Sequence, residues 1–189
     1  MNSVSFTANL VHNTSVPQRK SLFSYKDTDV SIVEIERTNP SDLDALDKAS
    51  GKWIKNRGEY AEAISFDASY GTKDNEFIRK HFYALTTQNS NHEHLIPEKI
   101  LGLMMFEETK NPENEIVCLE VNPSTSKSKS LIRKYKQVGR RLVEFVQSNF
   151  DQKAIYVYAD CRALNFYKKL GFKQQFKDLP RACEMHWSI

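Results

Sequence analysis

The chain has 189 residues, of which 40% are hydrophobic and 27% charged, with only six glycines and six prolines. This composition excludes disordered and collagen-like proteins, and the length suffices for one domain with one core. The longest apolar runs, such as ILGLMMF at 100–106, are far shorter than the roughly 20 residues that cross a bilayer. We therefore expect no membrane partner.

The net charge of +3 is unevenly distributed along the chain. Between positions 124 and 143 there are seven basic residues and no acidic ones: Lys127, Lys129, Arg133, Lys134, Lys136, Arg140 and Arg141. Elsewhere 20 Lys and Arg stand against 24 Asp and Glu, so the basicity is local. By itself this segment allows three interpretations: a solvated helix face, a nucleic-acid patch, or a seat for the phosphates of a small ligand.

Residues 1–27 are rich in Ser, Thr and Asn and lack the charged and apolar regions of a secretory signal. They predict a polar N-terminal tail before a domain that spans residues 28–189. The three cysteines share no short spacing, which disfavours a disulfide framework or a cysteine-based zinc site. A reducing, cytoplasmic location is expected.

The first half of the domain begins with a predicted strand over 30–36 and a helix for which Ser41 is the expected N-cap. One or two short helices are expected between 57 and 81, including the run NEFIRKHF at 75–82. Three antiparallel strands follow, over 82–88, 99–108 and 115–121. In the third strand, simple alternation places Val117, Leu119 and Val121 on one face and Ile116, Cys118 and Glu120 on the other.

The second half alternates between strands and helices. Apolar residues recur at helical spacing from Val138 to Val146, a strand is predicted over 154–159, and a second helix over 163–170 ends at Gly171. The last nine residues read as a final strand. The whole order predicts an α+β fold, with a mixed, mostly antiparallel sheet flanked by helices and one βαβ crossover.

The region from about residue 98 to the C-terminus resembles the GNAT superfamily of acyl-CoA-dependent N-acetyltransferases. Its helix-start motif is Arg or Gln, two residues, Gly, one residue, and Gly or Ala; here KYKQVG at 134–139 occupies it. The first position is Lys and the middle glycine is Gln137, and about seven extra residues precede the motif. A second signature, Ala163, Tyr167 and Gly171-Phe172, matches the family fully.

The resemblance implies acetyl-CoA, or another acyl-CoA, as co-substrate. Independently of it, the positive end of a helix and its unpaired N–H groups favour a pyrophosphate. The residues expected to bind the cofactor are Leu119, Val121, Lys134, Lys136, Gln137, Val138, Gly139, Arg140 and Asp160. Lys127 and Lys129 are candidates for contact with a ribose phosphate, and Asp160 is expected to cap the following helix.

The resemblance also suggests catalytic roles. Tyr167 matches the tyrosine that donates a proton to the departing CoA thiolate, although its place on an apolar stripe also fits a core residue. Glu115 matches the general base of the histone-lysine branch, with Glu120, Glu108 and a water relay as alternatives. His186 is a candidate for lining the acceptor pocket.

Other chemistry is less favoured. His92 and His94 lack further ligands at metal spacing, so no metal site is predicted. Cys118 and Cys161 have no identifiable His partner, which favours direct transfer in a ternary complex over a cysteine nucleophile.

The predicted function is transfer of an acyl group to a primary amine: a lysine side chain, a protein N-terminus, a polyamine, an aminoglycoside-like drug or aminoacyl-tRNA. Two alternatives stay open, namely a non-catalytic acyl-CoA sensor and a nucleic-acid-binding protein. The chain is expected to act as a monomer or homodimer.

Overall fold

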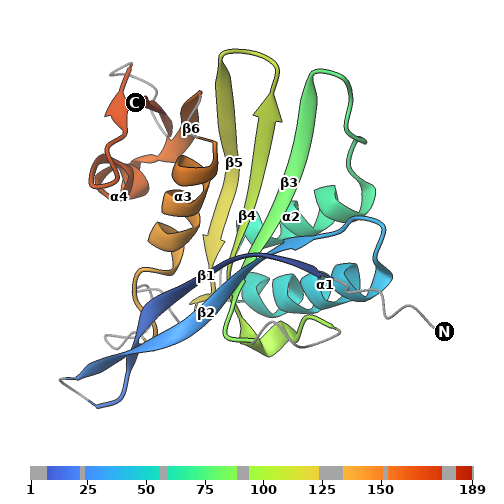
Figure 1. Cartoon of the computed structure of the whole chain (residues 1–189), viewed down its shortest axis with the longest axis vertical. Coiled ribbons are helices and arrows are strands. Elements are labelled where there is room, and N and C mark those ends of the chain that lie inside the picture. The colour runs from blue at the N-terminus through green and yellow to red at the C-terminus, as the bar shows by residue number, and fades with distance from the viewer. Residues whose placement is uncertain are drawn as a thin grey trace.

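In the computed structural model, eight strands form one sheet in the order β1-β2-β3-β4-β5-β6-β8-β7 (Figure 1). The structure describes residues 8–21, 24–55, 59–88, 94–123, 134–150, 153–175 and 182–188. Within these ranges β5 and β6 run parallel, and every other neighbouring pair of strands is antiparallel. The predicted α+β class with a mostly antiparallel sheet is confirmed.

The N-terminal region forms a long hairpin. β1 (Ala8–Arg19) pairs with β2 (Tyr25–Ile35) along its whole length, so the prediction of a tail over residues 1–27 is wrong from Ala8 onward. As the edge strand, β1 leaves its described side chains exposed or half-buried except that of Val16, and its polar composition therefore resembles that of a loop. Pro17 is tolerated because its missing N–H would face the outer edge of β1 and not β2, while Val16 is fully buried and anchors the strand.

Two helices cover one face of the sheet. α1 (Pro40–Ile54) starts at Asn39, whose side chain accepts a hydrogen bond from the Ser41 backbone N–H; Ser41 is therefore not the N-cap. α2 (Glu59–Tyr70) packs beside α1, and Trp53 and Ile64 join the core against the sheet. No helix of the described residues is long and apolar enough to cross a membrane.

The central meander consists of β3 (Ile78–Thr86), β4 (Ile100–Thr109) and β5 (Glu113–Val121), with a short 3₁₀ turn, η1 (Pro97–Lys99), before β4. The three predicted antiparallel strands are confirmed. The expected helix over 75–82 is wrong, because the Asn75 side chain accepts hydrogen bonds from the N–H groups of Phe77 and Ile78 and turns the chain into β3.

The predicted crossover is also confirmed. β5 leads through α3 (Val138–Asn149) to β6 (Ala154–Asp160), which pairs with β5 in parallel. The chain continues through η3 (Cys161–Ala163), α4 (Leu164–Lys168) and β7 (Lys173–Gln174) to β8 (Ala182–Trp187). α3 and α4 lie on the face of the sheet opposite α1 and α2, where Leu142 and Tyr167 enter a second part of the core.

Candidate active site

β5 and β6 form a fork. They pair at only three positions, Glu113↔Ala154, Asn114↔Ile155 and Glu115↔Tyr156. Beyond Glu115 the ladder ends, although β5 continues to Val121 and β6 to Asp160. The facing edges of both strands consequently carry N–H and C=O groups with no partner from the opposite strand.

A β-bulge in the pairing of β5 with β4, on the edge of β5 that faces away from β6, redirects the side chains of β5. Met105 pairs with Cys118 and Phe106 with Ile116, so Val117 is the extra residue on β5. The predicted alternation is therefore wrong for two residues: Ile116 packs in the core beneath α3, and Val117 joins Cys118 on the side of α1 and α2. Leu119 and Val121 pack on the α3 side.

A cleft of about 520 Å³ opens between the end of β5 in the fork, the start of α3, and the segment of η3 and α4. Seven of the residues expected at the site line it: Leu119, Val121, Gln137, Val138, Gly139, Arg140 and Tyr167. Six further residues line the cleft: Glu120, Tyr135, Ala163, Phe166, Lys169 and Leu170. Of these, the sequence had indicated only Glu120, as an alternative base, and Ala163, as part of the second signature. Residues far apart in the sequence thus meet in one hollow.

Gln137 adopts the left-handed conformation that glycine favours. Its φ is 62° and its ψ is 13°, and among the described residues it is the only non-glycine residue with positive φ. The motif that this segment resembles has glycine at this position, and glycine adopts the left-handed conformation without a steric penalty. The left-handed region costs an L-residue roughly 1–2 kcal/mol, so the surrounding contacts must hold Gln137 in place.

Gly139 lies where α3 meets the wall of the cleft. A Cβ atom at this position would stand 3.4 Å from both Phe166 Cζ and Val121 Cγ1, and 3.6 Å from Leu119 Cδ2. The missing side chain therefore leaves room beside β5, at the end of α3 whose N–H groups have no helical partner. An extended, phosphate-bearing ligand fits this arrangement.

Comparisons with known proteins identify the fold. No family model matches the sequence, and no curated protein matches it at a significant level. Solved structures do match. A Lactobacillus plantarum protein classed as an N-acetyltransferase is 14% identical with a TM-score of 0.53, over 83% of this chain and 96% of that one.

An acyl-CoA N-acyltransferase from Pseudomonas aeruginosa is 11% identical with a TM-score of 0.53, over 83% of this chain and 98% of that one. Escherichia coli ElaA is 13% identical with a TM-score of 0.51, again over 83% and 98%. The chain has the GNAT fold.

Tyr167 lines the cleft, and its ring is packed against two aromatic neighbours. Its ring makes edge-on contacts with Phe166 at 4.9 Å and Phe172 at 5.4 Å between centroids. Burial raises the pKa of Tyr167 well above its ordinary value, and Tyr60 and Cys118 add to the shift. The phenol is consequently neutral, and able to donate a proton, throughout the physiological pH range.

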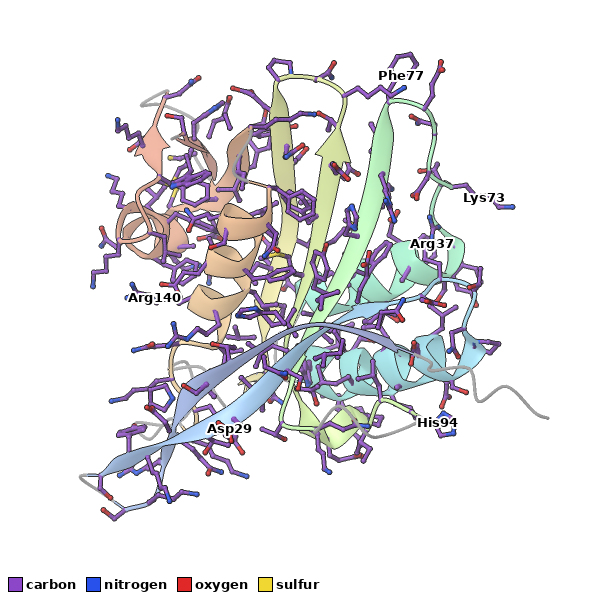
Figure 2. All side chains as sticks on the ribbon, in the orientation of Figure 1. Asp29, Arg37, Lys73, Phe77, His94 and Arg140 are labelled. Carbon is purple, nitrogen blue, oxygen red and sulfur yellow. The ribbon has the colours of Figure 1, made fainter. Side chains whose placement is uncertain are left out.

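The basic residues around the start of α3 are held by protein groups. The ammonium of Lys136 lies 3.7 Å from the centre of the Tyr25 ring, and that of Lys134 lies 5.5 Å from the Tyr135 ring. Neither lysine lines the cleft. Arg140 does line it, beside the first turn of α3 (Figure 2), although its Nε donates to Glu144 Oε1 at 2.6 Å.

Asp160 acts as a cap. Its carboxylate accepts a hydrogen bond from the Arg162 backbone N–H at 2.8 Å and forms an ion pair with the Arg162 side chain, which lowers the pKa of Asp160 to about 2. The predicted capping role is confirmed, for η3. Lys127, Lys129 and His92 lie outside the described residues.

Glu115 stands at the closed end of the fork and does not line the cleft. Its Oε2 accepts a hydrogen bond from the Tyr156 hydroxyl at 2.5 Å, which fixes the carboxylate across the last paired position of β5 and β6. Of its rivals, Glu108 is engaged with His81 at 3.3 Å. His186 stacks on Tyr156 and contacts Glu113 and Glu184.

Glu120 lies at the open end of the fork and lines the cleft. Burial raises its pKa, while the backbone N–H groups of Val121 and Tyr60 favour the charged form and limit the shift. Tyr60, in the first turn of α2, has Asp160, Cys118 and Glu120 among its electrostatic neighbours. No sequence pattern indicated Tyr60, since its position depends on how α2 packs against β5.

The cysteines offer no nucleophile of the usual kind. Burial raises the pKa of Cys118 to about 11, so its thiol is protonated at neutral pH. Cys161 is exposed at the start of η3. Across the described part of the chain, no group of three His, Cys, Asp or Glu side chains is arranged to hold a metal ion.

Proposed function

We propose that this protein is an N-acyltransferase that moves an acyl group, acetyl in the first instance, from CoA to a primary amine. The observation that carries the proposal is the joining of the β5–β6 fork to the start of α3 in one cleft, with Gln137 in the glycine-like conformation. The likeness to solved structures supports the GNAT fold that this chemistry uses.

The residues present suit an acyl-CoA. The N–H groups of the first turn of α3 and the side chain of Arg140 would bind the pyrophosphate, with Lys134 and Lys136 adding positive charge nearby. The unpaired edge of β5 around Leu119 and Val121 would bind the amide-containing arm by strand-like hydrogen bonds.

In the proposed reaction the amine attacks the thioester carbonyl directly. The C–N bond forms, the C–S bond breaks, and the N–H groups on the β5 edge near Leu119 stabilise the negative oxygen of the tetrahedral intermediate. Glu115 accepts the proton that the ammonium group must lose, with Glu120 as the second candidate for this role. Tyr167 gives its proton to the departing thiolate, which leaves as a neutral thiol, and the resulting tyrosinate takes up the second proton that the attacking nitrogen loses as it becomes an amide.

Thiol release in the presence of an amine panel tests the proposal. The wild-type chain and acetyl-CoA are incubated with one acceptor at a time: a lysine peptide, a peptide with a free N-terminus, a polyamine, an aminoglycoside or an aminoacyl-tRNA. We expect thiol release and an acetylated product with at least one acceptor. Binding of CoA by calorimetry without turnover on any acceptor would instead favour the non-catalytic sensor.

A further inference from the structure

The β1–β2 hairpin reaches past the first turn of α3 (Figure 1) and pairs with the chain that leads into that helix. This α3 entry segment comprises residues 134–137. The Arg19 N–H donates to the Lys134 carbonyl at 2.7 Å, and the Lys136 N–H donates to the Pro17 carbonyl at 2.9 Å. The entry segment thus forms an isolated antiparallel β-bridge, Gln18↔Tyr135, on the outer edge of β1.

Side chains reinforce this pairing around Gln18. Its Nε2 donates to the Tyr135 hydroxyl at 2.9 Å, and its Oε1 accepts from Thr28 Oγ1 at 3.0 Å and from the ammonium of Lys20. Because both ends of the amide are engaged, Gln18 is fixed in orientation. Tyr135 is 8% exposed and lines the cleft, so a residue of the hairpin contacts a wall of the candidate active site directly.

The hairpin also holds the chain on the far side of Gln137. Arg141 Nε donates to the Ser15 carbonyl at 3.0 Å, and the Arg141 backbone N–H donates to the Gln137 carbonyl at 3.0 Å. Lys136 contributes the contact with the Tyr25 ring of β2. Gln137 is therefore held between two attachments to the hairpin, one before it and one after it.

We propose that the β1–β2 hairpin is a positioning element of the cofactor site: it imposes the left-handed conformation at Gln137 that glycine would adopt without help. A strained residue persists only where its surroundings determine it, and the hairpin supplies those surroundings. Gln18 and Tyr135 are its positioning residues, and the part of the acyl donor that depends on them is the phosphate-bearing end. The inference rests on the proposed function.

The test compares donors with and without phosphates. Both Q18A and Y135F remove the Gln18–Tyr135 hydrogen bond, and this shared loss should raise the KM for acetyl-CoA and the calorimetric Kd for CoA by about fivefold. The kcat should stay within about twofold of the wild-type value, since the fork and Tyr167 are untouched. With acetyl-pantetheine, which has no phosphates at the α3 end, kcat/KM should be unchanged. Amide exchange at Gln137 should quicken.

N13A is the matched control. It removes the hydrogen bond from Ser31 Oγ to Asn13 Oδ1 at 3.1 Å, within the same hairpin but away from the α3 entry segment, and should change none of these quantities. An unchanged CoA affinity in both Q18A and Y135F, or an equal loss with both donors, would overturn the inference alone. Failure of the wild-type chain to bind CoA would overturn the proposed function together with it.

Discussion

Replacing Gln137 with glycine should stabilise the protein. The left-handed conformation costs an L-residue roughly 1–2 kcal/mol, and glycine avoids this cost. Glycine in turn is more flexible in the unfolded chain, and fixing its backbone on folding costs about 0.5–1 kcal/mol more than for a residue with a side chain. Gln137 is exposed and its side chain makes no capping hydrogen bond, so truncation removes little else. The net gain is about 0.5–1 kcal/mol, or about 1–4 °C in Tm for a domain of this size.

The assay is thermal and urea unfolding of wild type, Q137G, Q137A and Q137N. Q137A keeps the Cβ atom and should be no more stable than wild type. The stability of Q137N should lie between those of Q137A and Q137G, because Asn tolerates the left-handed region. A Q137G protein no more stable than Q137A would refute the claim that the backbone is strained here.

A double-mutant cycle that combines Q137G with Q18A tests the role of the hairpin. If β1 imposes the conformation of Gln137, the CoA-affinity loss caused by Q18A should shrink in the Q137G background, because glycine holds the conformation unaided. Purely additive losses would mean that Gln18 and Gln137 act independently.

Three further predictions concern Tyr167, Gly139 and the pH dependence of stability. Y167F should lower kcat on the order of a hundredfold while the calorimetric Kd for CoA stays constant; an unchanged kcat would remove Tyr167 from the reaction. G139A should raise Tm, because alanine is about 1 kcal/mol better in a helix, yet weaken CoA binding because its Cβ enters the cleft; tighter binding would contradict the proposed placement. Burial raises the folded-state pKa of Tyr83 and Tyr167 above the unfolded value near 10, so the unfolded chain ionises first and stability, complete below pH 10, should fall as pH rises further. Urea unfolding at pH 8 and pH 11 checks this, and equal free energies of unfolding would contradict it.

The identity of the base is a separate prediction. E115Q should lower kcat/KM most at low pH and keep CoA affinity, because only the uptake of the amine proton is removed. E120Q is the matched variant, since both carboxylates lie on β5 and only Glu120 lines the cleft. The pH dependence of kcat/KM for both variants decides between them, and wild-type profiles in both would leave a water relay as the route.

The sequence was sufficient where local periodicity matches the final structure. The repeats that begin at Val138 and Ala163 report buried helix faces directly, the continuous apolar run of β4 reports a strand buried on both faces, and each element lies close to its predicted range. β1 was missed because an edge strand buries few side chains, and its polar residues carry no period-2 signal. Asn75 ends the irregular stretch before β3 by a side-chain turn that propensity alone does not distinguish from a helix start.

The shape of the site depends on pairings that no single segment encodes. The bulge at Val117 exists only in the register of β5 against β4, and the fork begins only where β6 leaves β5 after Glu115. The sequence at 134–139 identified the motif but not its backbone conformation, since the positive φ at Gln137 is visible only in the structure.

The hairpin explains how the loop keeps that geometry without the glycine. Two backbone hydrogen bonds and the Gln18–Tyr135 contact join β1 to the α3 entry segment. At about 0.5–1.5 kcal/mol each, these three hydrogen bonds contribute a net stabilisation comparable to or larger than the roughly 1–2 kcal/mol of strain at Gln137. Conformational freedom that one glycine would supply locally is thus replaced by contacts from a strand more than 100 residues away in the sequence, so β1 and the cofactor site should tolerate change only together.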